Sequence, residues 1–171
     1  MKNLIVGSAL IALAAVSVRA EMGLAAIKGT AEKSPISGTV TLTDVKDGLK
    51  VEAKLSGVPA GLHGFHIHEF GTCDDSGKAA GGHFNPHNAM HGDVVKSGPK
   101  KAHAGDMGNI TAGPDGSATL EVVIPKTSLS AGKNNVAGRA IILHEKADDF
   151  GQPTGNAGGR IGCGLIAITA K

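Results

Sequence analysis

Hydrophobic and polar residues alternate in several short stretches of the chain, and most of these stretches end at glycine, proline, aspartate or asparagine. Alternation with a period of two is typical of β-strands that bury one face. Because no stretch shows a convincing helical period, we predict an all-β protein, an eight-stranded Greek-key sandwich or barrel. The expected strands are residues 22–30, 36–44, 49–55, 64–69, 108–112, 118–124, 140–144 and 162–169.

The connections between these strands are of two kinds. Asp47-Gly48 and the segment 113–116 (Gly-Pro-Asp-Gly) tolerate the positive φ that tight hairpin turns require. By contrast, residues 70–106 and 145–159 are far too long for turns, and each begins just after a histidine near a strand end. Loops beyond about 12–15 residues in a compact domain are usually functional or disordered. We therefore expect two long functional loops.

The first 20 residues have the pattern of a secretory signal peptide. Lys2 precedes an apolar run, and Val18-x-Ala20 is a small-residue cleavage site. A membrane anchor is the alternative, but the uncharged run is shorter than the ~20 residues that a spanning helix needs. We expect cleavage after Ala20, one domain over residues 21–171, and no membrane association afterwards. The segment carries two of the 17 basic residues and no acid, which leaves 15 against 15 acidic residues. A formally neutral chain gives no reason to expect nucleic-acid binding.

The chain has two cysteines, Cys73 and Cys163. An even pair in an exported protein is most simply one disulfide. A cysteine metal ligand or a reactive thiol is the alternative, although the chain offers better metal ligands elsewhere.

Seven of the eight histidines lie between residues 63 and 103, and the eighth is His144. His66 and His68 alternate with apolar residues, so on a strand both imidazoles lie on one face. Two surface histidines on an exposed strand would give the same pattern. His144 ends a strand that reads as buried.

Further candidate ligands follow in the first long loop. His83 lies in a glycine-rich turn, and His91 follows eight residues later. The pair His103-x-x-Asp106 adds one oxygen to a nitrogen-rich set, which suits zinc.

Five segments along the chain, taken in order, resemble the signature segments of copper/zinc superoxide dismutases. The similarity covers essentially the whole chain after the signal peptide. The segments are GFHIHEFG, GGHFNP, HAGDMGN, ILHEKADDFG and GNAGGRIGCG.

This resemblance implies an enzyme that converts superoxide to oxygen and hydrogen peroxide, with one copper and one zinc per chain. Copper would change oxidation state, whereas zinc cannot and would be structural. His83 would bridge the two metals as an imidazolate. The implied copper ligands are His66, His68, His83 and His144, and the implied zinc ligands are His83, His91, His103 and Asp106.

The resemblance also assigns residues outside the ligand sets. Asp148 would join His66 to His91, Arg160 would hold the anionic substrate beside copper, and Cys73 would pair with Cys163. Two further histidines, His63 and His87, match no ligand, and we expect them to be solvated loop residues.

Two departures from the animal and plant pattern favour a bacterial, periplasmic protein over a eukaryotic secreted one. Cys73 follows His68 by only five residues, and the loop 145–159 lacks the acidic-lysine cluster that steers substrate in other members. The steering lysines are therefore left open, as is pairing into a homodimer. Candidate steering residues are Lys78, Lys96, Lys100 and Lys101.

Two other classes of protein remain as alternatives, a copper-delivery or copper-storage protein and a purely structural β-sandwich. Relatives of the first class usually lose copper ligands or the arginine, and this chain retains both. The second class gives no reason for seven candidate ligands at these spacings.

Overall fold

The computed structural model describes residues 20–169 and consists of β-strands with almost no helix. The predicted all-β class is therefore confirmed, while the predicted signal peptide lies outside the described residues apart from Ala20. Within residues 20–169, no helix has the length and apolar character needed to cross a membrane. The strands are β1 (Met22–Gly29), β2 (Ser37–Val45), β3 (Gly48–Ser56), β4 (Gly61–Ile67), β5 (Asp106–Ala112), β6 (Ala118–Pro125), β7 (Ala140–His144), β8 (Arg160–Leu165) and β9 (Ala167–Ile168); the helical turns are η1 (Lys78–Ala80) and α1 (Val94–Ser97).

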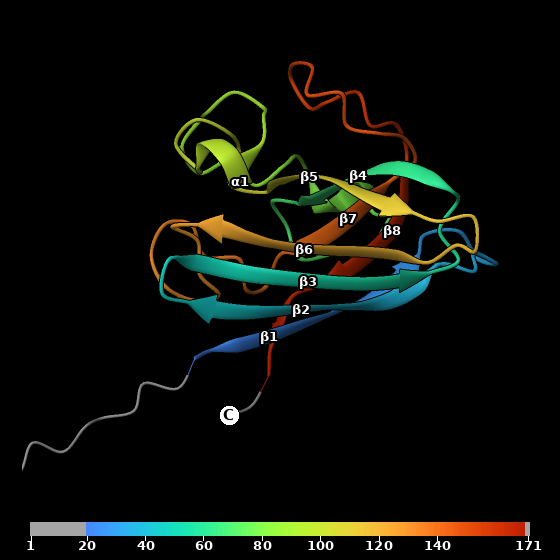
Figure 1. Cartoon of the computed structure of the whole chain (residues 1–171), viewed down its shortest axis with the longest axis horizontal. Coiled ribbons are helices and arrows are strands. Elements are labelled where there is room, and N and C mark those ends of the chain that lie inside the picture. Colours follow the sequence, from blue (N-terminus) through green and yellow to red (C-terminus); the bar gives the residue numbers. More distant parts are fainter. Residues whose placement is uncertain (1–19, 170–171) are drawn as a thin grey trace, which may run out of the picture.

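Eight antiparallel strands close into a barrel (Figure 1). The order around it is β2-β3-β6-β5-β4-β7-β8-β1, and β1 pairs with β2 to complete the ring. The connection from β3 to β4 passes over β6 and β5, as in a Greek key. Among the described residues, the short ninth strand pairs only with β1.

The predicted strands all occur, but the last one is divided. Ile166 separates β8 from β9 and turns into the core, where it is 1% exposed. Its N–H donates to Arg139 O (2.8 Å), and its carbonyl accepts from Gly138 N–H (2.8 Å). The last predicted strand is interrupted at Ile166 because the backbone of this residue bonds to the loop before β7.

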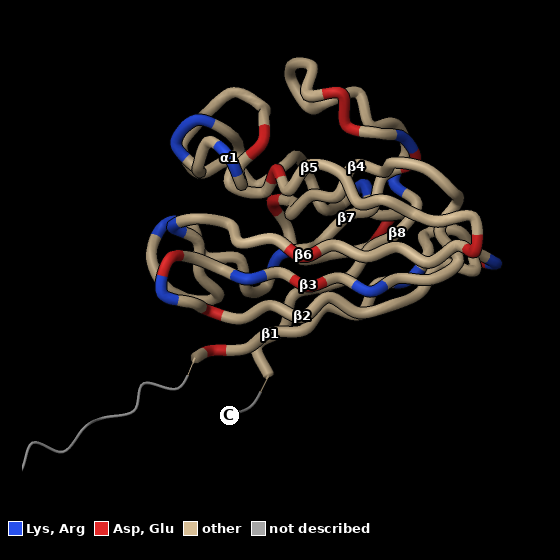
Figure 2. Tube along the Cα trace, viewed as in Figure 1, with Lys and Arg blue, Asp and Glu red and all other residues tan. Residues whose placement is uncertain are grey.

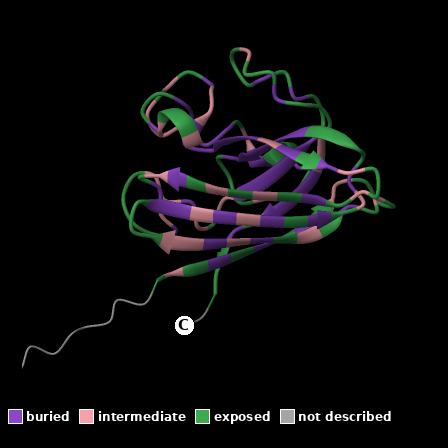
Figure 3. Cartoon of the chain, viewed as in Figure 1, coloured by how far each residue is buried: buried purple, intermediate pink, exposed green. Residues whose placement is uncertain are grey.

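Which residues of a strand are buried depends on what packs against each of its two faces (Figure 3). In β1 exposed and buried residues alternate, whereas all of β7 and the end of β4 are buried. Ile141 and Leu143 of β7 join the main core, and Ile142 packs instead with Cys163 and Ala80. These two strands are therefore covered on both sides, by the barrel interior and by residues 68–105, here called the long loop.

Two seams of the barrel, β1–β8 and β5–β6, have only two residue pairs each. β5 pairs with β6 only at Thr111–Thr119 and Ala112–Ala118. Helix α1 of the long loop packs against both strands. Figure 1 shows α1 and residues 145–159, here called the second loop, on the same side of the barrel.

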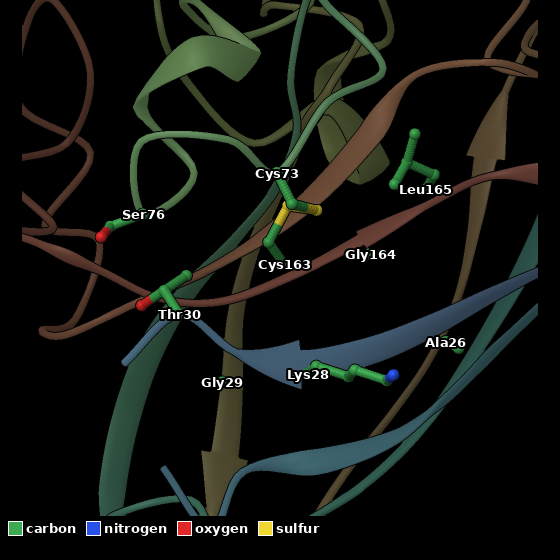
Figure 4. Close-up of a pocket in the computed structure, with 9 residues that line it drawn as sticks. All are labelled: Ala26, Lys28, Gly29, Thr30, Cys73, Ser76, Cys163, Gly164 and Leu165. Atoms are coloured by element: carbon green, nitrogen blue, oxygen red, sulfur yellow. A yellow bond between two sulfur atoms is a disulfide. The ribbon is translucent and has the colours of Figure 1, made fainter. Parts of the chain in front are cut away.

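A disulfide between Cys73 and Cys163 ties the long loop to β8 (Figure 4), and the predicted pairing is confirmed. Cys163 is almost fully buried, at 4% exposed. The bond closes a sequence separation of 90 residues.

Candidate metal centre

Seven buried side chains form two groups of four that have one residue in common, His83. In each group, the potential ligand atoms all lie within 4.8 Å of one another. Together they comprise every residue that the sequence led us to expect as a ligand. The first group, here called the four-histidine group, is His66, His68, His83 and His144, and the second, the aspartate-containing group, is His83, His91, His103 and Asp106.

Strand pairing brings the four-histidine group together. β4 and β7 are neighbours, and His66 of β4 lies opposite Ile142, two residues before His144. His68 follows β4 and forms an isolated antiparallel bridge with His83 of the long loop. The main-chain bonds Glu69 N–H to Gly82 O (2.9 Å) and Phe84 N–H to Ile67 O (2.9 Å) extend this pairing. The backbone segments that carry the four imidazoles are therefore held together by strand pairing.

The ring nitrogens are oriented by acceptors around the groups. His68 Nδ1 donates to Gly81 O (3.0 Å), while His66 Nε2 and His91 Nε2 contact the two oxygens of Asp148, each at 2.9 Å. Since carbonyl and carboxylate oxygens accept, these nitrogens carry the hydrogens. In the neutral form of each ring, the opposite nitrogen then has a lone pair that faces its group, as metal ligation requires.

Two buried ring nitrogens, His66 Nδ1 and His91 Nδ1, have no hydrogen-bond partner. His91 Nδ1 is 2.9 Å from Asp106 Oδ2, but this close approach lacks hydrogen-bond geometry. Almost all buried polar groups in native proteins have a partner. One such nitrogen lies in each group, so a metal ion in each is the partner that fits.

Burial keeps three imidazoles of the four-histidine group neutral. It lowers the pKa of His68 to about 2, that of His144 to about 3 and that of His83 to about 4. Neutral imidazoles are the form that binds metal ions. At neutral pH, protons therefore do not compete with a metal ion for the lone pairs of these three rings.

In the aspartate-containing group, the electrostatics favour a charged Asp106 beside a charged His91. Burial opposes ionisation of Asp106, but close contacts with His103, His83 and His91 outweigh it, so the pKa of Asp106 lies below its usual range. Burial likewise disfavours charged His91, yet Asp106 and Asp148 raise its pKa to about 9. The carboxylates create a place for positive charge, which suits a divalent cation.

Asp148 is fixed by residues whose role the sequence did not reveal. Asn109 Oδ1 accepts from Asp148 N–H (2.7 Å), and Asn109 Nδ2 donates to Asp148 O (2.9 Å). Gly155, at φ 78°, lies so close that a Cβ there would collide with Asp148 Oδ1 and stand 2.6 Å from His91 Nε2. Both residues lie in the family-like segments HAGDMGN and GNAGGRIGCG, but their role was not visible there, because their partners are distant in sequence or defined only by the folded loop.

Arg160 begins β8 directly opposite His144 in the strand register. Its Nη1 donates to Gly77 O (2.5 Å) and its Nη2 to Gly81 O (2.6 Å), the same carbonyl that holds His68. The charge of Arg160 contributes to the lowered pKa values of His68 and His144. The guanidinium is thus fixed within electrostatic reach of the four-histidine group.

The prediction that His63 is a solvated loop residue is wrong. It lies in β4, is 4% exposed, and places its ring nitrogens 2.9 Å from His144 O and 2.8 Å from Pro59 O. His87 is half-buried, and its Nε2 bonds to Asn134 Oδ1 (2.8 Å). Both rings are engaged in contacts that only the tertiary structure creates, and neither belongs to a metal group.

The four lysines considered as steering residues are all exposed. Lys78 lies in η1 beside the anchors of Arg160, whereas the others belong to α1 or follow it directly. Figure 2 shows the basic segments of the long loop around α1. The three lysines in or after α1 are Lys96, Lys100 and Lys101.

Comparison with known proteins gives the family of this chain. The sequence profile of the copper/zinc superoxide dismutase (SODC) family matches residues 36–166. The chain belongs to the copper/zinc superoxide dismutase family. An extracellular superoxide dismutase (Cu-Zn) of Brugia pahangi is 38% identical over 145 residues, 79% of this chain and 71% of that protein. A crystal structure of the clock protein EA4 superposes with a TM-score of 0.77 and 36% identity, over 86% of this chain and 94% of that one.

Membership in the copper/zinc superoxide dismutase family brings copper and zinc as cofactors and superoxide as the small-molecule substrate. The two histidine-rich groups supply one candidate site for each metal. The expectation of a superoxide-dismutating enzyme is thereby confirmed.

Proposed function

We propose that the four-histidine group holds copper, that the aspartate-containing group holds zinc, and that His83 bridges the two. The chemistry of the donors supports this assignment. Four imidazoles suit a copper ion, whereas three imidazoles with one carboxylate are typical of tetrahedral zinc. The observation that carries the proposal is the sharing of His83 between the two groups.

The reaction consumes two superoxide anions and two protons, and it yields one oxygen and one hydrogen peroxide. Copper, when bound, supplies the one-electron chemistry by alternating between two oxidation states. The protein must bring in a small anion and hold a proton near the reacting oxygens. Arg160 and His83 are the residues that we assign to these two tasks.

Arg160 attracts and orients the anion. A guanidinium stays charged at all relevant pH values and presents several donors in a fixed fork. Nη1 and Nη2 each bond to a carbonyl of the long loop, so the fork does not rotate freely. It lies beside the edge of the four-histidine group because β8 pairs with β7.

His83 is the residue placed to hold a proton. Its Nδ1 lies 2.8 Å from Asp106 Oδ1 and 3.5 Å from His103 Nδ1, on the zinc side. Its Nε2 is then the nitrogen offered to the four-histidine group. If Nε2 were released from the metal, it could take up a proton from solvent, hold it next to the site of reaction and donate it to the peroxide product.

Metal analysis together with a superoxide-consumption assay tests this function. We expect the purified, metal-loaded protein to contain one copper and one zinc per chain and to consume superoxide catalytically. Metal without catalysis would instead support a copper carrier, and absence of both would support a structural sandwich.

Replacing Arg160 with Ile is expected to lower activity at least about tenfold, because a focused positive charge raises the encounter rate of a small anion by 10-fold or more. Copper and zinc contents should stay near those of the parent, since the guanidinium touches no candidate ligand atom directly. Arg160→Lys should retain more activity, and the parent should slow in high salt because charge is screened beyond about 8–10 Å. Full activity of Arg160→Ile with both metals bound would contradict the role.

We also propose that the protein is exported. The signal-like sequence of residues 1–20 and the extracellular location named for the Brugia pahangi relative support export in general. A periplasmic location stays a prediction from the sequence, as does pairing into a homodimer.

A further inference from the structure

Gln152, in the second loop, bonds to both main-chain groups of one candidate zinc ligand. The N–H of His91 donates to Gln152 Oε1 (3.0 Å), and Gln152 Nε2 donates to His91 O (2.9 Å). A neighbouring β-strand would bond to a residue in much the same way. Because the two bonds act on opposite sides of His91, they restrict rotation of its backbone, and hence the direction in which its side chain leaves the chain.

Three alternate residues of the second loop contact His91. Asp148 Oδ1 lies 2.9 Å from its Nε2, and the ring of Phe150 stacks on the imidazole with centroids 6.4 Å apart and planes inclined by 21°. Gln152 holds the main chain. The ring and the backbone of His91 are therefore fixed by separate residues of the same loop.

Gln152 and Asp148 differ in the number of metal groups that they contact. The carboxylate of Asp148 also bonds to His66, so it influences both metal groups. Within residues 20–169, the amide of Gln152 bonds only to His91, which belongs to the aspartate-containing group alone. A change at Gln152 should therefore act on one group and spare the other.

We propose that Gln152 is a positioning residue for the zinc site, which aims His91 Nδ1 at the other donors and couples zinc retention to the folded second loop. The buried His91 Nδ1 without a hydrogen-bond partner is the atom whose placement this amide controls. This inference rests on the proposed assignment of zinc to the aspartate-containing group. Residues around metal ligands of this kind typically change metal affinity 10- to 100-fold when they are replaced.

The test compares zinc release from the parent holoenzyme with that from Gln152→Met and Gln152→Glu. Methionine preserves the length of the side chain and removes both bonds, while glutamate retains an acceptor and loses the donor to His91 O. Thr154→Ala, an exposed position in the same loop, is the matched control. We expect both Gln152 variants to release zinc to a chromogenic chelator at least about 10-fold faster than the parent, in line with the effect of such partners.

Two spectra distinguish a specific effect on the position of His91 from a general loosening of the second loop. With cobalt(II) in the zinc site, the visible absorption of the Gln152 variants should change, while the copper(II) resonance spectrum stays that of the parent. The proposal is overturned if the Gln152 variants release zinc at a rate within twofold of the parent, or if their cobalt spectrum is unchanged. It is also overturned if Thr154→Ala releases zinc as fast as the Gln152 variants do. If the parent itself holds no zinc or cobalt at this group, the proposed function fails first, and the inference fails with it.

Discussion

Replacing His83 with Ala is expected to abolish superoxide consumption and to weaken zinc binding in the same variant. The activity should fall by about 100-fold or more, the contribution typical of a positioned proton donor, even before the loss of a copper ligand is counted. Zinc should dissociate at least about 10-fold faster, because the aspartate-containing group loses one of its four donors. Stopped-flow decay of superoxide and chelator-driven zinc release measure the two effects.

His87→Ala provides the matched control for this substitution. His87 lies in the same loop and bonds through its ring to Asn134, but it belongs to neither metal group. It should keep both metals and near-parental activity. Normal zinc retention in the His83→Ala protein would contradict the bridge between the two groups.

Loss of the disulfide is expected to cost roughly 4–5 kcal/mol of unfolding free energy, the chain-entropy value for a closed loop of this length. Replacing both Cys73 and Cys163 with Ser should lower the denaturant midpoint of the metal-free protein accordingly. Activity should fall as well, since Gly77 N–H bonds to Cys73 O (3.0 Å) and Gly77 O anchors Arg160. The bond thus supports the orientation of the guanidinium.

Chemical reduction supplies the control for that comparison. The reduced parent should unfold at the same denaturant concentration as the double-serine variant, and reductant should leave the variant unchanged. Unfolding of the oxidised parent at the midpoint of the variant would show that the cross-link contributes nothing to stability.

Local patterns were sufficient to predict most of the fold. Strands such as β3 bury every second residue, so the period of two is visible in the sequence itself. The break at Ile166 was not predictable, because this residue is apolar and continues the pattern of β8. Its main chain bonds to residues 138 and 139, and such distant partners leave no trace in the local sequence.

The candidate ligands were visible because histidine is rare and chemically distinctive, and because the family segments are contiguous. The residues that hold those ligands were not. Gln152 and Asn109 are ordinary polar residues whose partners lie 61 and 39 positions away. His63 failed as a prediction for a related reason, since its acceptors are main-chain carbonyls, including that of His144, that only the fold brings near.

The weakly paired seam between β5 and β6 bears on aggregation. A closed barrel has no free strand edge, and free edges are what neighbouring chains use to pair. Here β5 and β6 are paired at only two residue pairs, and α1 packs against both strands. That helix lies in the long loop between His91 and His103, both members of the proposed zinc site. Zinc at this site would thus help to hold α1 against a weakly paired part of the barrel, and so oppose strand pairing with other chains there.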